Sequence, residues 1–133
     1  MKKLFNSLML VLLIAAIFVF YEEMKSTRIN ANDLANEYSK NKIEADNKYL
    51  QKEIEVKGTV KGFYELSDIN NVLQLKTDSS GVNIYCIFPD SLEESSDINF
   101  QPGDDVLLNG TCLGIDRFKS FEGLKIEIKR INK

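Results

Sequence analysis

The two cysteines, Cys86 and Cys112, are the most reactive side chains that the sequence offers. Each stands in a run where every second residue is apolar, as in a half-buried strand, so we expect both thiols to point into one interior. In an exported domain, two such cysteines can form a disulfide. A disulfide requires Cα atoms within about 7 Å, however, and the two strands are not expected to be direct neighbours. A bond between Cys86 and Cys112 and two buried free thiols therefore both stay open.

The residue types in the sequence give little support for a catalytic site or a metal site. The sequence contains no histidine, which removes Ser–His and Cys–His nucleophile pairs and most zinc sites. Asp104 and Asp105 are adjacent, so on a strand their carboxylates point to opposite faces and cannot share a substrate. The acidic loops lack the ordered spacing of a calcium-binding loop. We predict that the protein is not an enzyme, and that it has no cofactor and no metal site.

The charge balance disfavours nucleic acid as a partner. The chain has 17 Lys and Arg against 20 Asp and Glu, and leaving out Lys2 and Lys3 with the N-terminal segment gives 15 against 20. Binding to a phosphate backbone draws its affinity from clustered Lys and Arg.

The N-terminal segment is predicted to direct the protein to a membrane. Two lysines precede an uninterrupted apolar run from Leu8 to Tyr21, and Glu22 and Glu23 end it. Counted from Leu4, the segment gives roughly 27 Å of helix, against a hydrocarbon core of about 30 Å. We predict a signal anchor over residues 1–21 that contacts the membrane through residues 4–21, with a cleaved signal peptide as the alternative. The lysines favour an inside N-terminus, which places the domain on the extracytoplasmic side, or makes it secreted or periplasmic if the segment is cleaved.

A polar linker over residues 22–30 is expected to lead into a helical stretch. The sequence "NANDLANEYSKNKIEADNKYLQK", from Asn30 to Lys52, lacks Gly and Pro. Asn30 or Asn32 is placed to cap a first helix, and two apolar stripes indicate a second helical piece after a break near Asn41.

From Glu53 onward the apolar period becomes two. Five segments alternate in this way: "EIEVKGTVKGF", "VLQLKT", "VNIYCIF", "VLLNGTCLG" and "GLKIEIKRI". Glycines in the long first strand favour a bend in that strand. The segment "PDSLEESSDI", residues 89–98, breaks the alternation between the third and fourth strands and is expected to form a short helix or a loop. Five strands with this interruption predict an all-β core, a five-stranded Greek-key barrel of the OB-fold type, preceded by a short helical segment packed on the barrel.

The same residues resemble a known bacterial family. The motifs are "NKIEADNKY" from Asn41, "VKGTV" from Val56, "CIF" from Cys86, "PGDDV" from Pro102 and "NGTCLG" from Asn109. In this order they resemble the tRNA-anticodon-binding-like OB-fold proteins, over roughly residues 31–131. The resemblance implies a small exported or membrane-associated OB domain, with no catalytic residues to carry over.

An OB-fold binds its ligands on the face of its second and third strands and on the flanking loops. The candidate ligand-binding residues on that surface are Gln74, Lys76, Asn83, Tyr85, Tyr64, Arg117, Phe118 and Lys119. Tyr85, Phe118 and Phe121 are suited to stack on bases, whereas the acidic residues Glu65, Asp68, Asp116 and Glu122 in the same loops oppose a polyanion.

These inferences combine into one prediction. Residues 31–133 form an OB-fold domain that acts as a binding or interaction module of the cell envelope without catalysis, and its partner is a protein, peptide or glycan. The alternative is an OB-fold that binds single-stranded nucleic acid or an oligosaccharide.

Overall fold

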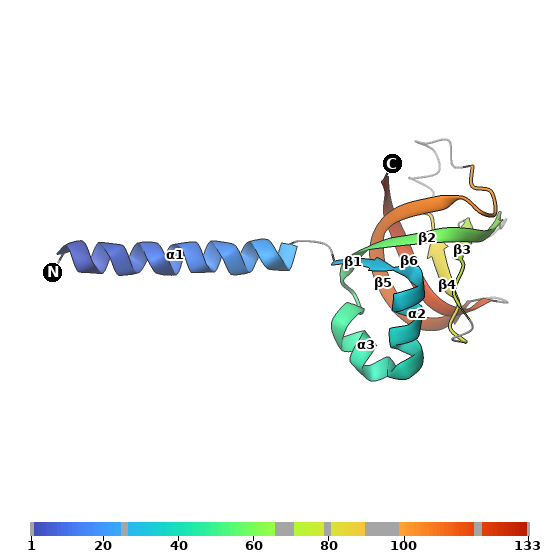
Figure 1. The fold of residues 1–133 in the computed structure, drawn as a ribbon, viewed down its shortest axis with the longest axis horizontal. Coiled ribbons are helices and arrows are strands. Elements are labelled where there is room, and N and C mark those ends of the chain that lie inside the picture. The colour runs from blue at the N-terminus through green and yellow to red at the C-terminus, as the bar shows by residue number, and fades with distance from the viewer. Residues whose placement is uncertain are drawn as a thin grey trace.

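The computed structural model describes residues 2–24, 27–65, 71–78, 81–89, 99–118 and 121–132. The elements follow the order α1 (Lys2–Met24), β1 (Thr27–Asn30), α2 (Ala31–Lys40), α3 (Lys42–Tyr49), β2 (Glu53–Tyr64), β3 (Val72–Leu75), β4 (Ile84–Ile87), β5 (Asp105–Phe118) and β6 (Phe121–Asn132) (Figure 1). Helices α2 and α3 precede strands β2 to β6 in the chain, as the sequence predicts. Of the predicted helix or loop over residues 89–98, residues 90–98 lie outside the described part of the chain.

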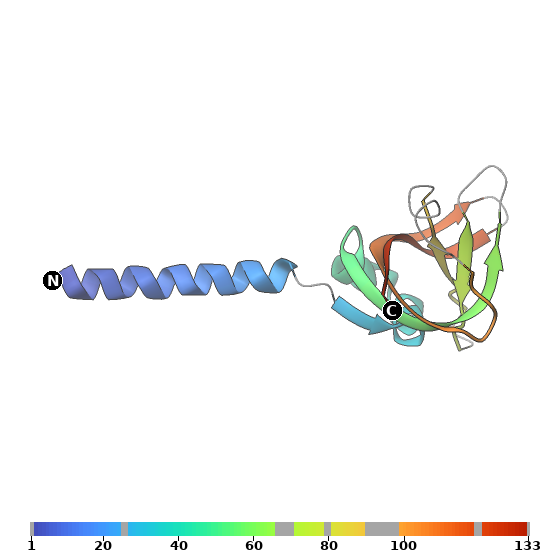
Figure 2. The same ribbon diagram turned by 90° about the horizontal axis from the view of Figure 1, so that it is seen from above.

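The strands form one mixed sheet in the order β1-β2-β3-β4-β6-β5, and β2 also pairs with β5. This extra pairing closes the sheet on itself, because the C-terminal half of β2 pairs with β3 while its N-terminal half pairs with β5. A register shift between Val60 and Gly62 marks the change, where the glycine pattern predicts a bend. Figure 2 shows the strands curving around a common interior.

The core lies inside this closed sheet. Alternate residues of strands β2 to β6 point inward, and Phe88, which follows β4, joins them. The nearly or fully buried core residues include Ile54, Val56, Leu73, Leu75, Ile84, Phe88, Leu108, Leu124, Ile126 and Ile128. Helices α2 and α3 cover one part of the core with Leu34, Ala35, Tyr38, Ala45 and Tyr49. The period-two pattern of the sequence thus corresponds to the inner face of the sheet.

Asn41 separates the two helices, as predicted. Its backbone N–H donates to the Glu37 carbonyl at the end of α2, and its side chain accepts from the Glu44 N–H at the start of α3. Asn30, one of the two predicted caps, caps α2 by accepting from the Asn32 N–H.

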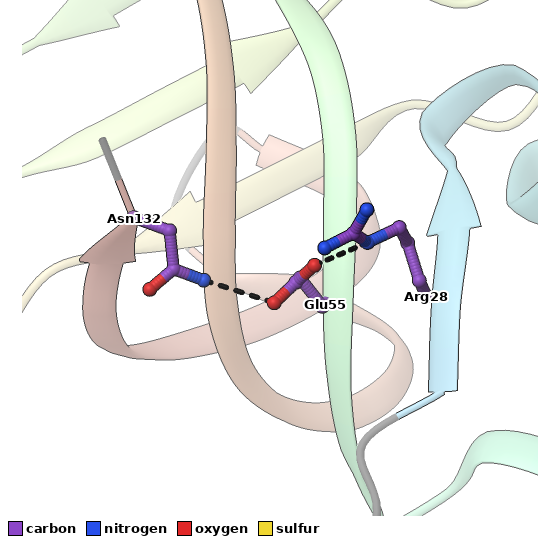
Figure 3. A network of polar contacts seen from close by, with 3 residues as sticks. All are labelled: Arg28, Glu55 and Asn132. Atoms are coloured by element: carbon purple, nitrogen blue, oxygen red, sulfur yellow. Dashed lines mark hydrogen bonds and ion pairs between the residues drawn. The ribbon is translucent and has the colours of Figure 1, made fainter.

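Strand β1 differs from the prediction, because it lies within the segment predicted as a linker. It pairs parallel with β2, with Ile29 beside Val56. The Glu55 carboxylate of β2 joins β1 to the rest of the sheet, because it accepts a hydrogen bond from the Arg28 guanidinium of β1. It also accepts a hydrogen bond of 3.0 Å from Asn132 Nδ2 at the end of β6 (Figure 3).

Helix α1 extends away from the sheet (Figure 1). Its apolar side chains are exposed, for example Leu8 at 60% and Phe18 at 65%. Among the residues that the structure describes, no helix is both long enough and apolar enough to cross a membrane. The predicted membrane span is therefore not confirmed.

Candidate ligand-binding surface

One row of outward-facing residues crosses four neighbouring strands. Gly62 of β2 lies opposite Gln74 of β3, Gln74 opposite Tyr85 of β4, and Tyr85 beside Lys125 of β6. Gln74 and Tyr85 do not belong to the core cluster, yet only 7% and 6% of their surfaces are exposed. Other side chains must therefore cover them on the outer face of the sheet.

Two aromatic rings provide this cover. The Phe121 ring lies over Tyr85, edge to face, with 5.1 Å between ring centroids, and it contacts the Tyr64 ring at 5.4 Å. Phe121 is half-buried and Tyr64 is 38% exposed, so these two rings form the outer layer. We call Tyr64, Tyr85 and Phe121 the aromatic patch.

Two glycines let the rings lie close to the backbone. A Cβ at position 62 would stand 2.9 Å from the Tyr64 hydroxyl, which occupies the space above Gly62. A Cβ at position 123 would stand 2.4 Å from the Asn83 carbonyl oxygen and 3.0 Å from the Tyr85 ring. The patch therefore depends on two positions that carry no side chain.

A chain of polar contacts runs below the rings. The Tyr64 hydroxyl donates to Gln74 Oε1 and Gln74 Nε2 donates to Asn83 Oδ1, each at 3.4 Å. Burial, with a smaller contribution from Tyr64, raises the pKa of Tyr85, so its phenol stays neutral at physiological pH. The surface thus combines apolar rings with neutral amide and hydroxyl groups, a combination that suits stacking and hydrogen bonding.

The structure brings four of the predicted site residues together, namely Tyr64, Gln74, Asn83 and Tyr85. Phe121, whose ring is suited to stacking, is not one of the eight candidate residues, yet it contacts both Tyr64 and Tyr85. The signal that could have included it is the spacing of two phenylalanines three positions apart, since Phe121 lies opposite Phe118 in the register of β5 and β6.

Other predicted residues lie elsewhere. Lys76 follows the end of β3 and lines a separate cavity of about 240 Å³ with Asn32, Lys57 and Asp78 near the start of α2. Arg117 forms an ion pair with Glu122 at 3.0 Å. Strand alternation places that pair on the opposite face of the hairpin from Phe121.

The structure does not describe the side chains of the last two predicted residues. Only the backbone of Phe118 is described, at the end of β5, and Lys119 lies outside the described residues.

Cys86 and Cys112 are both buried free thiols. Ile126 of β6 lies between them, because it is the register partner of Cys86 on one side and of Cys112 on the other. Strands lie about 4.8 Å apart, so the two Cα atoms stand about 10 Å apart, beyond the span of a disulfide. The structure therefore has the second alternative, two free thiols, and not the Cys86–Cys112 bond.

The environment of each thiol makes it unreactive. Burial raises the pKa of Cys86 to about 12. Burial also raises the pKa of Cys112, although its contact with the Tyr38 hydroxyl, 3.5 Å from Sγ, acts in the opposite direction. Within the described ranges, no three Cys, Asp or Glu side chains gather as a metal site would require.

The chain matches the model of a known family. A family model described as tRNA_anti-like matches residues 1–119. Among the curated proteins, no sequence matches this chain.

Solved structures provide further similarity. A lipoprotein of Klebsiella pneumoniae subsp. pneumoniae MGH 78578, described as a candidate nucleic acid-binding protein, superposes with a TM-score of 0.61 at 11% identity over 81% of this chain and 92% of that chain. A candidate aspartyl-tRNA synthetase of Leishmania major Friedlin gives a TM-score of 0.51 at 12% identity over 81% of this chain and 20% of the synthetase. At these identities the likeness is one of fold, and the fold is OB-like.

Proposed function

We propose that this chain, which belongs to the tRNA_anti-like family, is a binding module of the cell envelope that takes its ligand on the aromatic patch. The observation that carries the proposal is the position of three rings outside the sheet, where the core does not need them. Exposed aromatic side chains supply much of the binding energy of protein surfaces. Tyr64 and Phe121 contact the ligand, and the amides of Gln74 and Asn83 orient it.

The module binds without catalysis. The sequence has no histidine to act as a base. Both cysteine thiols are buried with a raised pKa, so neither provides a thiolate nucleophile near neutral pH.

Helix α1 attaches the domain to a membrane through residues 4–21, with the binding domain on the extracytoplasmic side. The support is the exposure of the large apolar side chains between Leu8 and Phe18, each more than half accessible, which is unfavourable in water. The likeness to a lipoprotein agrees with an envelope location. The full chain is expected to stay in the membrane pellet after alkaline carbonate extraction, and to be digested by protease added outside intact spheroplasts. Release into the supernatant, or protection from protease, would contradict this attachment and orientation.

The binding surface can be tested in the cell that produces the protein. Replacing Phe121 by the photoreactive residue p-benzoylphenylalanine retains an aromatic ring in the patch. Illumination is expected to link this position to its ligand, and digestion with protease, nuclease or glycosidase identifies the class of the adduct. The same residue at Ile43, which is 76% exposed on α3, is the control. Equal adducts at both positions, or none at position 121, would contradict the proposal.

Single-stranded nucleic acid is the second candidate ligand. It is favoured by the three clustered rings, since bases stack on such rings regardless of sequence, and by the description of the Klebsiella lipoprotein. If this candidate is correct, the protein should retain a labelled oligothymidine, and the retained fraction should fall steeply as the salt concentration rises from about 50 to about 200 mM. If the protein retains no oligothymidine even at low salt, single-stranded nucleic acid is excluded as the ligand.

A further inference from the structure

A second surface feature adjoins the aromatic patch. A cavity of about 550 Å³ lies between residues 62–65, at the end of β2 and just after it, and residues 99–102, before β5. This volume is in the range of about 300–1,000 Å³ typical of ligand sites. Tyr64 lines the cavity and also belongs to the patch, so the two form one continuous surface.

The cavity has an apolar side. Phe63 and Phe100 line it and pack edge to face at 5.8 Å between ring centroids, and both rest on the buried Phe88 ring, at 6.3 and 5.7 Å. Both lining rings are only half-buried. An apolar side chain of a ligand would cover their remaining surface.

The wall opposite β2 is fixed by hydrogen bonds. Gly103 N–H donates to the Val60 carbonyl at 2.8 Å, and Val60 N–H donates to the Asp104 carbonyl at 2.8 Å. Gln101 N–H also donates to the Asp104 carboxylate at 2.9 Å. The segment therefore holds its shape without a ligand, which lowers the entropic cost of binding.

The polar groups of the cavity select the charge of the ligand. Glu65 is exposed and is the one charged side chain among the described lining residues, which include no Lys or Arg. The amide side chains of Asn99 and Gln101 are joined by a hydrogen bond of 3.1 Å and offer their remaining groups to a peptide backbone. A polyanion is repelled here, whereas a cationic group is attracted.

We propose that this cavity binds a segment of a protein partner, with an apolar side chain of the partner against Phe63 and Phe100 and a neighbouring lysine or arginine at Glu65. The inference rests on the proposed function, since it extends the same surface and names the class of its partner. The apolar rings provide affinity, and the carboxylate provides selectivity against acidic segments.

The test uses the full chain in a zwitterionic detergent, labelled with nitrogen-15 for NMR. The probes are the blocked tripeptides acetyl-Lys-Phe-Lys-amide and acetyl-Glu-Phe-Glu-amide, with an oligothymidine as a third probe. The side-chain amide signals of Asn99 and Gln101 report on the cavity. Those of Gln74 and Asn83 report on the patch.

The lysine peptide is expected to shift the Asn99 and Gln101 signals and to bind about two- to fivefold more tightly than the glutamate peptide, as an exposed ion pair allows. Glu65→Gln should remove this preference without unfolding the domain. Glu44→Gln, at an exposed carboxylate of α3, should retain it.

Three results would overturn the inference: no shift of Asn99 and Gln101 with either peptide, equal binding of the two peptides, or stronger binding of the oligothymidine at this cavity. If the first of these results comes with shifts of the Gln74 and Asn83 signals, the inference fails but the proposed function still stands. The failure of the cavity and the failure of the patch are therefore separate outcomes.

Discussion

At the scale of single residues, Glu37 joins the two helices that cover the core. Its carboxylate accepts from Lys48 Nζ at 2.7 Å and from the Tyr49 hydroxyl. Burial raises the pKa of Glu37, but the bonds from Lys48 and Tyr49 lower it by more, so the net shift is downward. Burial, followed by the bond to Glu37, raises the pKa of Tyr49. Near neutral pH, Glu37 is therefore charged and Tyr49 is neutral, the states that make this contact.

The downward shift at Glu37 predicts how stability depends on pH. A carboxylate with a lowered pKa contributes stability above its unfolded pKa near 4.5 and loses it as the pH falls through the folded pKa. Glu37→Gln should therefore lower the free energy of unfolding at pH 7 by about 1 kcal/mol, discounted for partial exposure. The difference from the unchanged protein should vanish in acid, below the folded pKa.

Urea denaturation at a series of pH values measures this difference. Glu44→Gln, on the exposed side of α3, is the control and should show little change at any pH. A destabilisation by Glu37→Gln that persists equally in acid would show that the ionised contact is not its cause.

The buried cysteines give a second prediction at this scale. Because burial raises the pKa of both thiols, to about 12 for Cys86, neither should react with iodoacetamide at about pH 8 in the folded protein. Both should react fully in denaturant. Mass spectrometry after trapping measures the two states, and rapid alkylation of the folded protein or a bond between residues 86 and 112 would contradict the structure.

At the scale of elements, Asn41 ends one helix and starts the next. Its side chain accepts from the Glu44 N–H at 3.1 Å, which satisfies one of the free donors at the start of α3. Asn41→Ala should lower the free energy of unfolding by about 1 kcal/mol, measured as a lower urea midpoint. Asn47→Ala, at an exposed position within α3, is the matched control and should leave the midpoint unchanged or slightly higher. Equal effects of the two substitutions would contradict the capping role.

Elements with a strong local pattern could be predicted from the sequence, and β1 could not. Strands β2 to β6 repeat apolar residues with a period of two, which predicts a strand from local sequence alone. Asn30 and Asn41 are residues of a type that commonly caps helices. Strand β1 has four residues and one half-buried apolar side chain, Ile29. It is held by Glu55, which lies far away in the sequence, so no local pattern indicates it.

The same limit applies to the candidate site. Tyr85 and Gln74 could be predicted because strand alternation fixes their direction. Lys76 lies beyond the end of β3, where alternation no longer applies, and the Glu122 side chain sets the position of Arg117. The spacing of Phe118 and Phe121 indicates that they pair across two strands, but it does not indicate that the Phe121 ring lies over Tyr85 of β4, which depends on how β6 pairs with β4.

At the scale of the whole molecule, the proposed binding surface and the proposed membrane attachment lie apart. In both views, β3 and β4, which carry Gln74 and Tyr85, lie on the side of the sheet away from α1 (Figures 1 and 2). The strands that carry the aromatic patch are therefore separated from the proposed membrane attachment by the rest of the sheet. This arrangement suits a module that is held at a membrane and binds outward.

The most direct test of this account combines the photoreactive residue at position 121 with a change at Gly62. The substitution Gly62→Ala adds a Cβ that would stand 2.9 Å from the Tyr64 hydroxyl, too close for an ordinary contact, so it displaces that ring without removing it. Tyr64→Ala, which removes the ring, is the companion variant, and an unchanged urea midpoint verifies that each variant is folded. The account predicts that both substitutions strongly reduce the adduct formed at position 121 in the cell. An undiminished adduct in both folded variants would contradict the claim that the aromatic patch is the binding surface.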